Sequence, residues 1–75
     1  MCLGVPGRVI ELINGNQARV DVSGNLTTIS VMLTPQVRVG EYVLIHAGFA
    51  MEIVDEEWAL ESQKLWEEME KYARQ

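Results

Sequence analysis

Hydrophobic and polar residues alternate with a period of two through most of residues 9–54. Two stretches show this most clearly, with hydrophobic residues at Ala18, Val20 and Val22 and again at Ile29, Val31 and Leu33. Such alternation is typical of strands with one buried face. The segments between them contain residues that tolerate the positive φ of tight hairpins, Asn14-Gly15-Asn16 and Ser23-Gly24-Asn25. The pattern predicts a meander of three strands at residues 7–13, 17–22 and 26–33.

Two further strands are predicted after Thr34-Pro35, where proline interrupts the pattern because it has no backbone donor for a sheet. One covers residues 42–46, Tyr-Val-Leu-Ile-His, and a short one covers residues 49–54. Five short antiparallel strands would expose their edges unless the sheet closed on itself. We therefore expect a mainly β fold at residues 1–54, a small OB-like five-stranded antiparallel barrel or its SH3-like counterpart.

At Asp55 the period changes to that of a helix. Large hydrophobic residues recur at spacings of seven, four and three, at Trp58, Leu65, Met69 and Tyr72, with Trp66 and Ala73 widening the stripe. Asp55 is a suitable N-cap. We expect a C-terminal helix at residues 55–73 that packs this stripe on the barrel, with both tryptophans as anchors. The free energy gained by burying the stripe differs little from the entropy lost on ordering the helix, which internal hydrogen bonds partly offset. We therefore hypothesise that the helix can be released to a partner protein.

Length and charge narrow the class of protein. The 75 residues are expected to form a single domain, residues 1–75, with one modest core. The net charge is -5, and residues 1–51 contribute nothing to it, because their three acidic and three arginine side chains cancel. The acidic excess therefore lies in residues 52–75, which contain the predicted helix, where it forms at least a solvated face and disfavours nucleic acid as a partner.

The chain has neither a signal-peptide pattern nor an apolar run approaching the about 18 residues that span a bilayer. A single cysteine excludes an internal disulfide. These features indicate a cytoplasmic protein without membrane contact.

Cys2 and His46 are the residues that could carry chemistry. They are the only cysteine and the only histidine in the chain. Closure of the barrel would bring the fourth strand beside the N-terminal segment, so that thiol and imidazole converge. Such a pair can hold a metal fragment or form an activated nucleophile. The alternative for His46 is a purely structural one, a polar residue that ends a strand.

Nucleophilic catalysis is the weaker reading of this pair. It would need an oxyanion site and a pocket that excludes water, and a chain end preorganises neither. No second cysteine or histidine completes a closed zinc site. We therefore expect a carrier or adaptor rather than an enzyme.

Residues 1–9, Met-Cys-Leu-Gly-Val-Pro-Gly-Arg-Val, resemble the N-terminal signature of the HypC/HupF family of nickel-iron hydrogenase maturation chaperones. That signature is Met-Cys followed by aliphatic, small, aliphatic, proline, any, polar or basic, and aliphatic positions. Residues 46–50, His-Ala-Gly-Phe-Ala, resemble the family's second segment, which contains histidine, glycine, an aromatic residue and alanine. The length, the barrel and the C-terminal helix also fit, so the resemblance covers essentially the whole chain.

The resemblance implies a cargo rather than a permanently bound cofactor. Cys2 would hold, or help to hold, iron as a transient Fe(CN)2CO fragment, with His46 as a second contributor. HypD would be the partner in whose complex the fragment is assembled, and the immature hydrogenase large subunit would receive it. The residues implied to face a partner are Met1, Leu3, Gly4, Val5 and Pro6. The residues implied to support the site are Gly48, Phe49 and Ala50.

Two other classes remain open. A generic small β-barrel could serve as an interaction or nucleic-acid-binding module with an incidental cysteine. Its basic face would consist only of Arg8, Arg19 and Arg38, and aromatic residues for stacking are sparse on the strands. A thiol enzyme would require turnover by the isolated chain.

Overall fold

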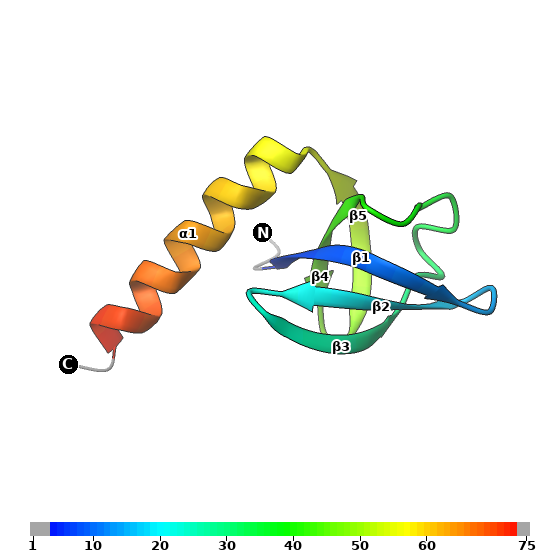
Figure 1. Cartoon of the computed structure of the whole chain (residues 1–75), viewed down its shortest axis with the longest axis horizontal. Helices are drawn as coiled ribbons and strands as arrows, with labels where there is room; N and C mark the ends of the chain where they lie inside the picture. The colour runs from blue at the N-terminus through cyan, green and yellow to red at the C-terminus, as the bar shows by residue number, and fades with distance from the viewer. Residues whose placement is uncertain (1–3, 74–75) are drawn as a thin grey trace.

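The computed structural model describes residues 4–73, which form a closed five-stranded barrel followed by one helix (Figure 1). The strands and the helix are β1 (Val5–Ile13), β2 (Gln17–Val22), β3 (Asn25–Ser30), β4 (Tyr42–His46), β5 (Phe49–Val54) and α1 (Glu56–Ala73). Around the barrel the order is β1-β2-β3-β5-β4. The expected mainly β fold with a C-terminal helix is confirmed. The barrel is not purely antiparallel, because β3 and β5 run parallel where Ser30 pairs with Phe49.

Small and β-branched side chains fill the interior of the barrel. The alternation seen in the sequence accounts for most of them, because every second residue of a strand points inward. The buried cluster consists of Val9, Ala18, Val20, Ile29, Val31, Val37, Val43 and Ala50. The core is thus narrow, as a five-stranded barrel requires.

Strand β1 joins two parts of the barrel. Its first half, from Val5 to Arg8, pairs with β4, and its second half, from Arg8 to Ile13, pairs with β2. A register shift between Val9 and Glu11 lets the strand bend between these neighbours. The start of β1 is thereby fixed against the end of β4.

The third strand ends earlier than predicted, at Ser30 rather than at residue 33. Beyond it the backbone turns, because the amide of Thr34 donates to the carbonyl of Val31 at 3.0 Å. Met32 and Leu33 are consequently exposed, and the core receives Val37 from the following loop instead. The alternation of hydrophobic and polar residues in the sequence continues to Leu33, but strand pairing ends at Ser30, where turn hydrogen bonds begin. The predicted strand was therefore too long.

Helix α1 begins where the sequence predicted, but a different face of it meets the barrel. The amide of Ala59 donates to the carbonyl of Asp55 at 2.9 Å, which closes the first helical turn. Three residues of the predicted stripe are largely exposed, with exposed fractions of 46% for Trp58, 62% for Leu65 and 59% for Met69. The face that meets the barrel consists of Ala59, which is fully buried, and the half-buried Ser62, Gln63 and Trp66.

The length and direction of α1 explain this correction. The helix packs on the outside of β1 and β4 with its first half and then runs past the barrel (Figure 1). A small residue such as Ala59 lets the helix backbone approach the strands closely, whereas the larger stripe has no strand to cover. Trp66 keeps part of its expected role as an anchor, and Trp58 does not. The side chain of Tyr72 lies outside the described residues.

No helix within residues 4–73 combines the length and the apolar character that crossing a membrane requires.

Candidate functional site

His46 ends β4 beside the start of β1. Val5 pairs with Ile45 in an antiparallel ladder, and the same register continued by one residue sets Gly4 across from His46. The side chain of His46 is exposed. The sequence-based expectation that the fourth strand lies next to the N-terminal segment is therefore confirmed for Gly4 and Val5.

Cys2 lies outside the described residues, as do Met1 and Leu3.

The start of β1 is packed from two sides. A Cβ atom added to Gly4 would lie 2.5 Å from Cγ of Leu44, so only glycine allows this close approach to β4. Pro6 pairs with Leu44 and is fully buried. Pro6 lies on the outward face of β1, together with Gly4 and Arg8. Because α1 packs on the outside of this strand, we attribute the burial of Pro6 to the helix.

A side-chain hydrogen bond joins α1 to this segment. Nε2 of Gln63 donates to the main-chain oxygen of Pro6 at 3.3 Å. Strand β2 pairs with β1 only from Arg8 onward, so Pro6 has β4 as a strand neighbour on one side and no strand on the other. A proline is tolerated at such a position, because no second strand requires its missing backbone N–H. The helix thereby holds the start of β1, the strand that follows Cys2 in the sequence. Sequence reasoning missed this role, because a glutamine on a polar helix face carries no signal of a partner 57 residues away.

The β4–β5 hairpin carries the second predicted segment. Ala47 and Gly48 have φ of 53° and 83°, so both central residues of the two-residue turn adopt the positive φ of a type I′ hairpin. The turn sets His46 and Phe49 opposite each other as a strand pair. Ala50 is buried in the core, whereas Phe49 is 39% exposed. The residues expected to support the site thus shape the hairpin that presents His46.

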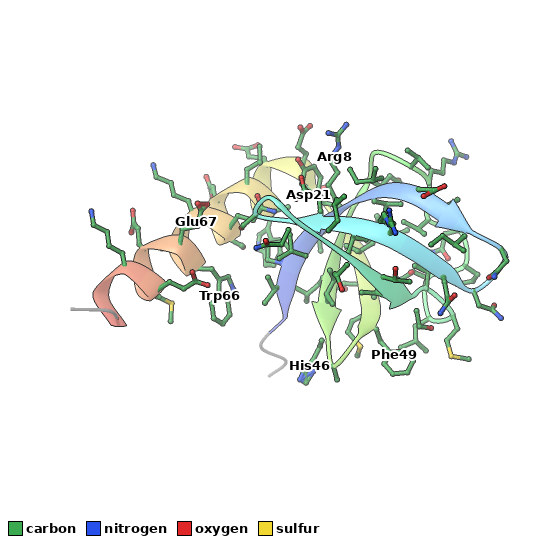
Figure 2. All side chains as sticks on the ribbon, turned by 60° about the horizontal axis from the view of Figure 1, so that its bottom comes forward. Arg8, Asp21, His46, Phe49, Trp66 and Glu67 are labelled. Atoms are coloured by element: carbon green, nitrogen blue, oxygen red, sulfur yellow. The ribbon has the colours of Figure 1, made fainter. Side chains whose placement is uncertain are left out.

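His46 and Phe49 lie on the same side of the molecule as Trp66 of α1, with the start of β1 between the hairpin and the helix (Figure 2). This surface is the candidate site, and we call it the thiol face. It comprises Gly4, Val5, His46, Phe49 and Trp66.

Two hollows occur elsewhere on the surface. One of about 350 Å³ is lined by Glu52, Ile53, Val54, Asp55 and Trp58 at the junction of β5 and α1. The other, of about 340 Å³, is lined by Glu61, Lys64, Leu65 and Glu68. Neither includes a residue of the thiol face. Among the residues that the structure describes, no three metal-binding side chains gather closely enough to hold a metal ion.

The chain is similar to known proteins over all the segments that form the candidate site. The HupF/HypC family model matches residues 1–66, which include the N-terminal segment, the barrel and the first half of α1. The proteins that the chain resembles are each named hydrogenase maturation factor HypC. That of Synechocystis sp. is 43% identical over 67 residues, which is 83% of this chain and 88% of that protein.

Two further relatives show the same likeness. The protein of Cupriavidus necator is 41% identical over 71 residues, covering 95% of this chain and 79% of that protein. The protein of Escherichia coli is 47% identical over 62 residues, covering 75% of this chain and 68% of that protein. The resemblance of residues 1–9 and 46–50 is therefore part of a match along most of the sequence, and the chain belongs to the HupF/HypC family.

Proposed function

We propose that this protein is a hydrogenase maturation chaperone that carries iron as an Fe(CN)2CO fragment. In this proposal it binds the fragment together with HypD and delivers it to the immature large subunit of a nickel-iron hydrogenase. It acts through protein contacts rather than as an enzyme, in the cytoplasm, where a reducing environment keeps the single cysteine as a thiol. Membership of a family whose relatives are named hydrogenase maturation factors supports the general role.

The pairing of β1 with β4 is the observation that carries the site assignment. The register sets His46 across from Gly4, and Cys2 is only two residues further along the chain. In the proposal the thiol of Cys2 and the imidazole of His46, 44 positions apart in sequence, bind one fragment. Loss of either group would weaken the site without removing any part of the barrel core.

The chemistry of the cargo suits a small number of protein ligands. Cyanide and carbonyl groups occupy several positions on iron, so a soft thiolate is a sufficient handle. In this step Sγ of Cys2 loses its proton and donates an electron pair to iron, with no change in oxidation state. Donor groups of the receiving subunit displace the thiolate at delivery. A site with one thiolate and an exposed histidine allows that exchange, whereas a closed four-ligand site would resist it.

Partner proteins would complete the site. The thiol face has an exposed hairpin on one side of β1 and a helix on the other, so an incoming surface can reach the N-terminal segment (Figure 2). Gly4 and Pro6 are fixed by β4 and α1, which limits the entropy lost when a partner binds the start of β1.

The test is infrared spectroscopy of the protein purified with HypD. The wild-type complex should show cyanide and carbonyl stretching bands, and Cys2→Ala should lose them while its circular dichroism and unfolding midpoint stay unchanged. Thr27→Ala, on an exposed position of β3, serves as the matched control and should retain the bands. Bands of full intensity in the Cys2→Ala complex would refute the thiol as iron carrier. Salt-sensitive binding to oligonucleotides that ignores the Cys2 change would favour the nucleic-acid-binding class instead.

A further inference from the structure

We propose that Trp66 and Met69 on α1 form a docking surface that selects the partner protein brought to the thiol face. The occupant to which we commit is a protein surface with an apolar pocket bordered by basic side chains. The inference rests on the proposed function, because it assumes that a partner covers the start of β1.

The position of Trp66 follows from the hydrogen bond one turn earlier. Gln63 contacts Pro6, and a residue three positions later lies about 4.5 Å further along the helix axis on nearly the same face. Trp66 is half-buried, so part of its side chain is accessible to a partner. Met69 follows after another three residues and is mostly exposed. The helix thus extends beyond the barrel with two neighbouring large apolar side chains, Trp66 on the contact face and Met69 on the exposed stripe beside it.

The side of the molecule on which Trp66 lies links it to the thiol face. Trp66 is on the same side as His46 and Phe49, and the start of β1 lies between the helix and the hairpin (Figure 2). A partner that covers β1 at this point meets an aromatic side chain on either side of it. Buried aromatic residues supply much of the affinity of protein interfaces.

The charge of the helix indicates what kind of partner fits. The described side chains of α1 include six glutamates and two lysines. In the barrel the numbers of acidic and basic side chains are nearly equal. Glu67 points to the other side of the helix from Trp66 in Figure 2, so its contribution is to the long-range field rather than to direct contact. Such a field accelerates association with a basic surface.

The experiment compares tryptophans at the two ends of the same helix. Trp66→Ala, Met69→Ala and the control Trp58→Ala are titrated against HypD and, separately, against the immature large subunit, with helix content followed by circular dichroism. Trp66→Ala should weaken binding to at least one partner tenfold or more, and Trp58→Ala should stay within twofold. Trp66→Leu keeps an apolar side chain that supports the helix but removes the aromatic ring. Weaker binding by this variant therefore reports loss of the contact with the partner rather than unfolding of the helix. Wild-type affinity of Trp66→Leu and Met69→Ala for both partners would overturn the proposal.

Charge and self-association provide two further arms. The double variant Glu67→Lys, Glu68→Lys should slow association at low salt more than Glu56→Lys, Glu57→Lys at the first turn, and equal rates would contradict the charge argument. Sedimentation of the free chain tests a second copy as occupant. A dimer that Trp66→Ala dissociates would overturn the assignment to a different protein.

Failure of this inference is distinguishable from failure of the proposed function. Cyanide and carbonyl bands that depend on Cys2, with normal binding by every Trp66 variant, would remove only the docking surface. Absence of these bands from the wild-type HypD complex would remove the iron cargo, whatever the helix variants do.

Discussion

Gln63 on α1 and Pro6 on β1 are joined by a hydrogen bond from Nε2 to the main-chain oxygen, 3.3 Å long and spanning 57 positions of sequence. Together with the burial of Ala59, this contact attaches the helix to the strand that leads to the thiol. Apart from the half-buried Trp66, the rest of the helix has little hold on the barrel, because Leu65 and Met69 are exposed. The attachment is therefore narrow, and its loss should free the second half of α1.

Replacing Gln63 by alanine should loosen the helix without unfolding the barrel. One hydrogen bond of this kind contributes roughly 0.5–1.5 kcal/mol. In the wild type, backbone amides from Leu65 onward should already exchange with solvent faster than those of Val20 and Val43, and the variant should widen the difference. The matched control is Lys64→Ala, whose side chain is exposed. Exchange in α1 as slow as in the barrel core would show that the helix is firmly docked and would contradict its release to a partner.

Gly7→Ala should destabilise the barrel, and Gly15→Ala should not. A Cβ atom at Gly7 would lie 2.7 Å from Cδ1 of Ile45 and 3.1 Å from Cγ2 of Val22, so these side chains must shift. Overpacking of this kind costs about 1–3 kcal/mol. A Cβ atom at Gly15 has nothing within 4 Å. Urea unfolding measures both variants, and equal midpoints would mean that the barrel yields at Gly7 without cost.

The type I′ turn predicts opposite effects at its two central residues. Ala47 holds a φ of 53°, which disfavours alanine but is tolerated by asparagine, so Ala47→Asn should stabilise the protein by about 0.5–1 kcal/mol. Gly48 has a φ of 83°, and Gly48→Ala should destabilise it by about 1 kcal/mol. Thermal unfolding of both variants checks the signs. Stabilisation by Gly48→Ala would show that the turn changes conformation at small cost.

His46→Gln separates the two readings of that residue. The side chain is exposed, so the free energy of unfolding should stay within about 0.5 kcal/mol of the wild type. As a contributor to the iron site, His46 should alter the position or intensity of the cyanide and carbonyl bands in the HypD complex when it is replaced. Thr28→Ala, exposed on β3, is the control. Unchanged bands would leave His46 with the structural role of ending a strand.

The local pattern of the sequence was sufficient for the elements of this fold. Period-two alternation located all five strands, with boundaries that hold for β2, β4 and β5, because inward and outward positions of a strand differ in burial. The glycines and asparagines of the turns marked the hairpins. The change of period at Asp55 marked the helix to within one residue.

Local pattern was insufficient where two segments compete for the same place. Leu33 continues the alternation but is exposed, because backbone turn bonds after Ser30 redirect the chain and Val37 fills the core. The apolar stripe of α1 likewise suggested the buried face, yet the fit of Ala59 against the barrel decided the orientation. Neither outcome depends on hydrophobicity alone, since close approach and backbone pairing are properties of the assembled barrel.

The sequence by itself determined which chemical groups this protein contains: one thiol at residue 2, one imidazole at residue 46, and an acidic excess after residue 51. Those features depend on residue type and spacing, which are fixed before folding. The tertiary structure decided which segments lie side by side. Closure of the barrel pairs β1 with β4 and sets His46 across from Gly4, and the bond between Gln63 and Pro6 brings α1 to the same segment. These contacts join residues about 40 to 60 positions apart, so only the packing of the whole chain could select them.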